Sequence, residues 1–186
     1  MSIVIDTYTK EFLIEQYNLH KSYVLGRLSG MNKSNMKIRL PSIPEDISEN
    51  IIKFIIQNKN NDITSSWNCG VGDLYSHIEG VQECKCFTSD GPLSFTPSSV
   101  WNVIYFLDAR DWLNNHFKLY KLNISNTNEV WKNIKINKNE TFDDQAKQGR
   151  RPRLNWNDIQ KQLSSYITLI YEGTFEDIFI PLVIID

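Results

Sequence analysis

A near-continuous apolar run over residues 100–110, VWNVIYFLDAR, constrains the fold of this chain more than any other feature. A strand with this pattern is typically buried on both faces. It then needs packed layers above and below it, which predicts a central sheet between helices. The chain has 186 residues, of which 41% are hydrophobic. That is enough for one domain over residues 1–186 with its own core, and short for two.

The spacing of apolar residues predicts the elements around that strand. Alternating residues between glycines favour a hairpin with strands over 73–77 and 81–88. Helices are predicted over 7–29, as one helix or two, and within 40–60, 141–148 and 155–167, with a strand over 116–125 and an extended tail over 175–186. Residues 30–35 are expected to form a connector and 126–140 a loop or a helix. This order predicts an α/β fold, with α-helices flanking a mixed central β-sheet that starts with a β-meander.

The formal net charge of -2 gives no overall indication of nucleic-acid binding, so such a function must depend on a local patch. Cys84 and Cys86 are alternate residues of one predicted strand, which does not favour a disulfide. Cys69 and the three histidines lack the spacing of a zinc site. The N-terminus does not resemble a signal peptide, and no apolar stretch is long enough to span a bilayer. We therefore expect a cytoplasmic protein with reduced cysteines and no membrane partner.

Three charged residues around the predicted hairpin form a candidate catalytic site. Asp73 ends the glycine-rich CGVGD and opens the first strand, while Glu83 and Lys85 project from one face of the second. In a hairpin that turns near Gly80, Asp73 lies across from residues near Glu83, so the two carboxylates meet. Two carboxylates and water suit Mg²⁺, and a lysine beside them can orient a water or stabilise charge on a phosphate. The set has the groups needed for phosphodiester hydrolysis.

A surface ion pair is the simpler interpretation of Glu83 and Lys85, because an acid, any residue and a lysine occur together in most soluble chains. The neighbouring residues favour a functional site. Val81 and Phe87 flank the pair on the same strand face, and a face that begins and ends apolar is unusual for freely exposed charges. Cys84 and Cys86 are expected on the opposite face, toward the core.

The ordered set GVGD, then ECK in a strand, then CFTSDGPLSFTP resembles the PD-(D/E)xK nuclease superfamily, and in particular small type II restriction endonucleases. In that family a helix precedes an acid at the start of a strand, and a glutamate and a lysine follow on the next strand. The helix in PEDISENIIKFII and the basic QGRRPR fit the same plan. The resemblance covers about residues 38–165.

The resemblance implies a role for each matching residue. Asp73 and Glu83 correspond to the metal ligands, with the backbone carbonyl of Cys84 as a candidate third, and Lys85 corresponds to the family lysine. Glu49 matches a helical acid that reaches the metal in some members, although an acid that compensates the helix dipole is an equal alternative. The chain departs from the pattern at Gly72, where the family has a proline that is often missing.

Two segments are candidates for binding DNA. Residues 147–153 contain four basic side chains around Gly149 and Pro152, and arginine forks bind phosphates or guanine edges. These four are Lys147, Arg150, Arg151 and Arg153. Residues 88–99, TSDGPLSFTPSS, form a loop in which Ser89 and Ser94 can contact the DNA. The alternatives are a solvated charged surface for the first segment and an ordinary connection for the second.

These features together predict a Mg²⁺-dependent type II restriction endonuclease that cuts double-stranded DNA and leaves 5'-phosphates. Cutting both strands of a palindromic site favours a homodimer. A repair or recombination nuclease that acts on DNA structure is the alternative within the same fold. The alternative from another class is a non-catalytic DNA-binding or partner-binding domain, in which Glu83 and Lys85 are an ion pair.

Overall fold

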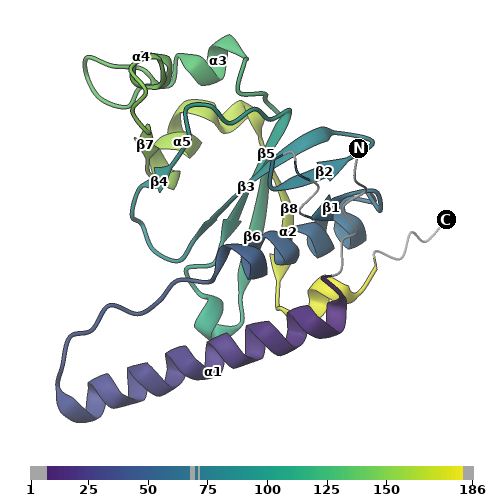
Figure 1. Ribbon diagram of the computed structural model, residues 1–186, viewed down its shortest axis with the longest axis vertical. Coiled ribbons are helices and arrows are strands. Elements are labelled where there is room, and N and C mark those ends of the chain that lie inside the picture. The colour runs from purple at the N-terminus through teal and green to yellow at the C-terminus, as the bar shows by residue number, and fades with distance from the viewer. Residues whose placement is uncertain (1–7, 68–69, 71, 182–186) are drawn as a thin grey trace.

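The computed structural model describes residues 8–67, 70 and 72–181. Its centre is a six-stranded sheet with the strand order β1-β2-β3-β5-β6-β8, in which β3 and β5 are parallel and the other pairs are antiparallel (Figure 1). The strands are β1 Ser66–Trp67, β2 Leu74–Ser76, β3 Gly80–Phe87, β5 Val103–Asp108, β6 Phe117–Leu122 and β8 Ile167–Gly173. The predicted mixed sheet is confirmed, and β1 to β3 form the meander at its start.

Strand β5 confirms the prediction made from the apolar run, because each of its six residues is buried. One face of the sheet packs against helices α1, Lys10–Ser34, and α2, Glu45–Lys59, and against the short 3-10 helices η1, Trp112–Asn114, and η3, Glu176–Phe179. The other face packs against α3, Glu129–Lys132, α4, Phe142–Lys147, and α5, Trp156–Leu163. The 3-10 helix η2, Ser164–Tyr166, connects α5 to β8.

Strand β3 alternates between these two cores. Cys84 is buried in the core beneath α1 and α2, and Cys86 packs against that core. Phe87 lies in the core on the other side of the sheet, where Val81 also packs. The predicted separation of the two cysteines from the face of Glu83 and Lys85 is therefore confirmed.

The structure corrects the expected course of the first helix. Residues 7–29 were expected to be followed by a connector over 30–35, but α1 continues to Ser34 as one helix. It ends at Asn35, which adopts a left-handed conformation with φ 50° and donates its backbone N–H to the carbonyl of Met31. Asparagine tolerates this conformation better than most residues, so the helix stops there and not at Gly30.

Two further corrections concern the C-terminal part of the chain. The predicted extended tail is wrong over Glu176–Phe179, which forms η3, and its end, residues 182–186, lies outside the described residues. Strand β8 was not predicted at all. It is an edge strand in which Tyr171 alone is buried, so its sequence lacks the alternation of a strand with one covered face.

A small second sheet lies above the C-terminal half of β3. It pairs β4, Leu93–Ser94, with β7, Arg153–Leu154, and so joins the two segments that were predicted to bind DNA. The segment over 88–99 belongs to the crossover between the parallel strands β3 and β5, and it crosses the sheet on the same side as α3 to α5 (Figure 1). None of the helices in the described part of the chain is long and apolar enough to cross a membrane.

Candidate active site

The β2–β3 hairpin places Asp73 beside the middle of β3. Leu74 pairs with Gln82 in the antiparallel register, so the residue before Leu74 lies opposite Glu83. The Oδ2 atom of Asp73 accepts a hydrogen bond of 2.7 Å from the backbone N–H of Cys84. This bond between a backbone N–H and a side chain lies next to the last backbone pair of β2 and β3, and it holds the Asp73 carboxylate at the edge of β3.

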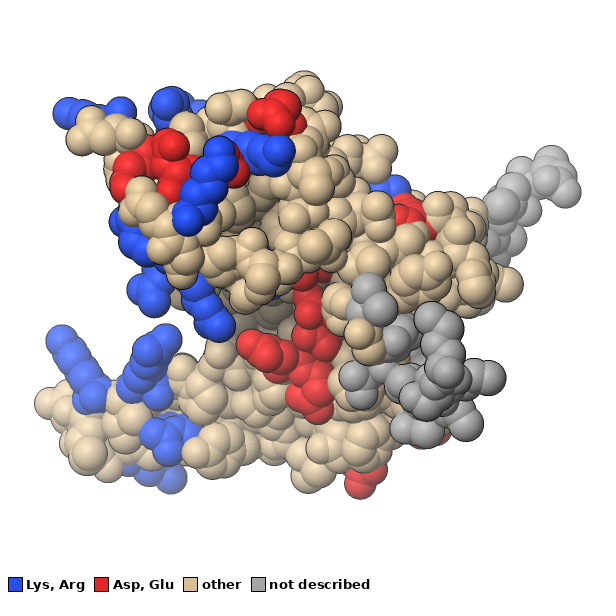
Figure 2. Space-filling view, turned by 45° about the horizontal axis from the view of Figure 1, so that its top comes forward, with Lys and Arg blue, Asp and Glu red and all other residues tan. Residues whose placement is uncertain are grey.

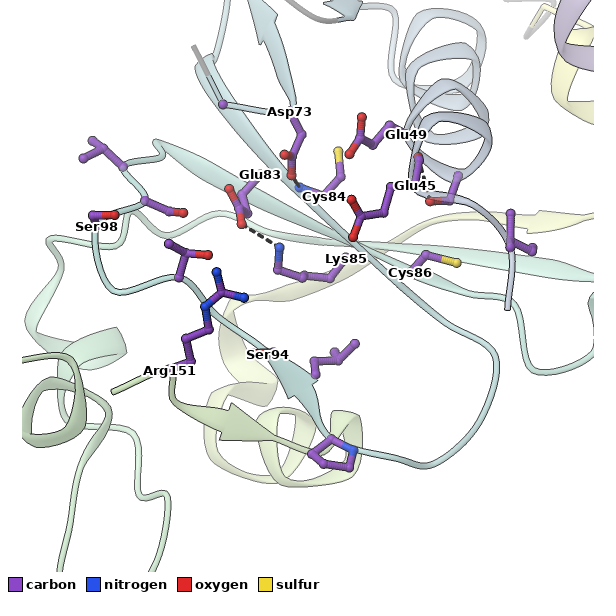
Figure 3. Close-up of a pocket in the computed structure, with 18 residues that line it drawn as sticks. Glu45, Glu49, Asp73, Glu83, Cys84, Lys85, Cys86, Ser94, Ser98 and Arg151 are labelled. Atoms are coloured by element: carbon purple, nitrogen blue, oxygen red, sulfur yellow. Dashed lines mark hydrogen bonds and ion pairs between the residues drawn. The ribbon is translucent and has the colours of Figure 1, made fainter. Parts of the chain in front are cut away.

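Glu83 and Lys85 form an ion pair in which Lys85 Nζ lies 2.6 Å from Glu83 Oε1. The pair is not on a solvated strand face. Glu83 is 5% exposed, and the ammonium group of Lys85 lies 5.9 Å from the centre of the Phe95 ring. Both side chains point into a hollow of about 780 Å³ (Figure 3). The ion pair is thus part of the candidate site.

Glu49 reaches the same hollow from α2, on the opposite side of Asp73 from the ion pair (Figure 3). Its Oε2 atom accepts a 2.7 Å hydrogen bond from the indole N–H of Trp67 on β1. Burial raises the pKa of Glu49 to about 7, and the nearby Asp73 and Glu45 carboxylates add to this rise, although Trp67 and Lys85 oppose it. Glu49 does more than compensate the helix dipole, because its side chain faces three other charged groups of the site.

Glu83 and Lys85 each favour the charged form of the other side chain. Burial raises the pKa of Glu83, and Asp73 adds to the rise while Lys85 opposes it. Burial lowers the pKa of Lys85, but the Glu83 carboxylate outweighs that cost and the net shift is upward. Lys85 is therefore an ammonium group at neutral pH and is not available as a general base.

The hollow contains more acidic than basic side chains. Four carboxylates line it, from Glu45, Glu49, Asp73 and Glu83, against the two cations of Lys85 and Arg151. Figure 2 shows acidic side chains gathered in a recess between two lobes, with basic side chains on both lobes at one end of it. Glu83 is buried, Glu49 and Asp73 are half-buried and Glu45 is exposed, and Lys85 and Arg151 compensate only part of this negative charge.

The residues predicted to bind DNA fall into three groups. Ser94 and Arg151 line the hollow, and the Arg151 guanidinium points toward Glu83 and Lys85 (Figure 3). Ser89 lines a neighbouring hollow at the end of β3. Lys147 and Arg150 are paired with Asp143 and Glu140, and Arg153 is exposed on β7 opposite Ser94.

A comparison with known protein families adds an independent observation. The model of the family described as Bsp6I restriction endonuclease matches residues 14–164, which include the hairpin, the hollow and the segment around Arg151. The chain belongs to this restriction endonuclease family. No curated protein and no solved structure gives a significant match. As a restriction endonuclease, the protein is a nuclease of the hydrolase class, and its substrate is DNA.

Several groups in the restriction endonuclease site were not predicted from the sequence. Trp67 holds Glu49, Glu45 lies at the start of α2, and Ser98 and Ser99 line the hollow from the crossover. Ser98 and Ser99 lie in the loop over 88–99, so its density of hydroxyl groups was the available signal. No such signal was available for Trp67, because its contact with Glu49 depends on β1 pairing with β2 and lying beside α2 in the folded protein.

Proposed function

We propose that the protein is a type II restriction endonuclease that uses a PD-(D/E)xK site and Mg²⁺ to hydrolyse both strands of a specific DNA sequence. One observation carries this proposal: Asp73, Glu83 and Lys85 converge on one hollow in a chain that belongs to a restriction endonuclease family. The products are 5'-phosphate and 3'-hydroxyl ends, and a homodimer matches the two-fold symmetry of a palindromic target.

The donor set of the hollow fits Mg²⁺. Asp73 and Glu83 supply two carboxylates on neighbouring strands, and Mg²⁺ binds in proteins through one or two carboxylates while it keeps several waters. Cys84 donates its N–H to Asp73, and in an extended strand the carbonyl of a residue projects from the same edge as its N–H. This geometry supports the Cys84 carbonyl as a third ligand. The described residues contain no group of three His, Cys, Asp or Glu side chains poised to hold a metal, so water and backbone oxygen complete the proposed shell.

The bound Mg²⁺ would lower the pKa of a coordinated water and neutralise charge on the scissile phosphate. The chain contributes the rest. Asp73 and Glu83 would hold the ion in place, and the Lys85 ammonium holds the attacking water or stabilises the charge that builds on the phosphate oxygens. The water oxygen attacks phosphorus in line and releases a proton to solvent, the bond from phosphorus to the 3'-oxygen breaks, and that oxygen takes up a proton from solvent as the 3'-hydroxyl forms.

Arg151 is the second cation of the hollow, and it comes from a different part of the chain than Lys85. It lies just before β7, so it enters the hollow from the side of the small β4–β7 sheet, whereas Lys85 projects from β3 (Figure 3). A guanidinium in this position can bind two phosphate oxygens at once. We assign Arg151 to the scissile phosphate and leave the more distant basic residues to flanking phosphates.

Incubation of the protein with unmethylated plasmid DNA and Mg²⁺ tests the proposed function. Discrete fragments with 5'-phosphate ends are expected, and Lys85→Ala should remove cleavage while DNA binding is retained, because the variant loses the Lys85 ammonium group but keeps Arg151 and the other basic residues. Smeared products or nicks at branched structures would favour the repair-type nuclease. Intact DNA at a large excess of enzyme would contradict the catalytic assignment, and full activity of Lys85→Ala would remove Lys85 from the mechanism.

A further inference from the structure

We propose that residues 33–39, at the end of α1 and in the connector after it, form a basic arm that binds the DNA backbone beside the cleavage site. The proposal rests on the proposed nuclease function and adds a surface to it. The basic arm carries Lys33, Lys37 and Arg39, and all three side chains are exposed. None of the three makes an ion pair within the described part of the chain.

The arm is the centre of a strongly basic segment. Residues 16–44 contain no acidic side chain, and five basic ones: Lys21, Arg27, Lys33, Lys37 and Arg39. The chain has 20 basic and 22 acidic residues in total, so 15 basic residues face 22 acidic ones elsewhere. A protein with a net charge of -2 can bind a polyanion only through such a local concentration of cations.

A second hollow lies at the end of the arm, and Ser42 and Ile43, which are adjacent in the chain, line this hollow and the catalytic hollow respectively. The second hollow has a volume of about 360 Å³, and Arg39, Thr88 and Ser89 are also among the residues that line it. From Ile43 back to Arg39 the chain spans at most about 14 Å, which corresponds to the rise of about four base pairs along the DNA helix axis. A strand leaving the catalytic hollow on this side thus reaches Arg39 a few phosphates from the cut.

Of the two arginines that line the second hollow, Arg39 is the one available to bind a phosphate. Arg110 also lines it, but the guanidinium of Arg110 lies 2.6 Å from both Asp90 and Asp108, so its charge is already compensated. Ser89 and Thr88 add hydroxyl groups that can donate to phosphate oxygens. Figure 2 shows basic side chains on both lobes at the open end of the recess, where the end of α1 faces the lobe of α3 and α4.

The basic segment over 147–153, one of the two segments predicted to bind DNA, is less available than the arm. Asp143 and Glu140 compensate Lys147 and Arg150, so half of that cluster is already paired. The catalytic hollow itself has an excess of carboxylates, which repel DNA. Cations outside both regions therefore add to the affinity for flanking DNA, and the arm supplies three of them.

The salt dependence of DNA binding tests this proposal. Binding of a duplex to the metal-free protein is measured by fluorescence anisotropy at several NaCl concentrations, with Lys33→Gln/Lys37→Gln/Arg39→Gln compared with the wild type. Each lost phosphate contact reduces the slope of log K against log salt by about 0.9, so the triple variant should have a slope shallower by about 2 to 3. Arg39→Gln alone should account for about one.

Lys10→Gln is the matched control, because it removes one exposed cation from the other end of the same helix, about 35 Å from Lys33. Its slope should equal that of the wild type. A triple variant with the slope and affinity of Lys10→Gln would overturn the proposal, as would an unchanged slope with loss of self-association in sedimentation, which would assign the arm to a second copy of the chain. Wild-type plasmid cleavage, measured in parallel, tests the nuclease function separately.

Discussion

The position of Glu49 shows how much a single side chain of the site depends on its surroundings. Its position on a helix and its negative charge could be predicted from the sequence, but its environment could not. Trp67, which binds the Glu49 carboxylate, and the desolvation by the surrounding core come from elements that meet only in the fold. The acid, the glutamate and the lysine of the site were predictable because they lie in one hairpin, where strand alternation fixes their directions.

The raised pKa of Glu49 predicts how the stability of the metal-free protein depends on pH. The unfolded chain loses the Glu49 proton above its ordinary pKa of 4.5, whereas the folded chain keeps it up to about 7. Between these values the folded state binds more protons, so the free energy of unfolding falls as the pH rises from about 4.5 to about 7. Thermal unfolding in EDTA across this range measures the effect.

Glu49→Gln is the control for this prediction. Glutamine keeps an acceptor for Trp67 but carries no charge, so most of the pH dependence should disappear. Part of it should remain, because Glu83 is shifted in the same direction. The carboxylates whose pKa is lowered, such as Glu172, affect stability only at lower pH. Equal slopes for the variant and the wild type would contradict the assignment.

Arg151 and Arg153 give a second prediction at the scale of the residue. They are two residues apart and both exposed, but only Arg151 lines the hollow. Arg151→Ala should lower the single-turnover cleavage rate by about 100-fold, as expected for one group that stabilises transition-state charge, and change DNA affinity little. Arg153→Ala should leave that rate near the wild-type value. Equal losses of rate in both variants would indicate a general effect of charge.

At the scale of the element, the β2–β3 hairpin brings the two catalytic acids together. Its turn is held by Glu79, which accepts hydrogen bonds from Tyr105 at 2.6 Å and from Gln82 at 2.8 Å and pairs with Lys121. The backbone N–H of Val81 donates to the side chain of Asn102 at 2.9 Å. The hairpin is therefore tied to β5, to β6 and to the crossover, and its register determines whether Asp73 lies opposite Glu83.

Two glycine substitutions test how far activity depends on this hairpin. Gly80 has φ +76°, and an added Cβ would lie 2.5 Å from Asn102 Oδ1, so Gly80→Ala should cost at least about 1 kcal/mol and reduce cleavage. Gly26, in α1, has nothing within 4 Å of an added Cβ. Gly26→Ala should therefore stabilise the protein by about 0.5–1 kcal/mol and leave cleavage unchanged. Urea unfolding and plasmid assays measure both, and a neutral Gly80→Ala would show that the turn tolerates a side chain.

The sequence predicted the elements unevenly, for physical reasons. Strand β5 and helix α2 were clear because their apolar patterns reflect burial. The edge strand β8 has one buried residue, and the two-residue strands β1 and β4 are too short for any period. The hollow also depends on the β4–β7 pairing, which joins residues about 60 positions apart in the chain. No local pattern encodes such a contact.

At the scale of the whole molecule, the excess of carboxylates in the hollow predicts that Mg²⁺ stabilises the fold. A ligand that binds the folded state alone raises the free energy of unfolding by mass action. The midpoint of thermal unfolding should rise with Mg²⁺ concentration at constant ionic strength, and Glu83→Gln should abolish this rise. Arg151→Ala should keep it, because Arg151 is not a proposed ligand. The same rise in Glu83→Gln as in the wild type would place the cation elsewhere.

The parallel pairing of β3 with β5 also affects how enzymes of this kind diversify. Because the two strands run in the same direction, the chain has to return over residues 88–102 along the full length of the sheet. That return segment carries Ser94, Ser98 and Ser99 to the hollow, while both proposed catalytic acids lie on the hairpin. We expect that mutations and insertions in this segment can change the DNA target without rebuilding the chemistry. The two functions can then evolve at different rates within one small chain.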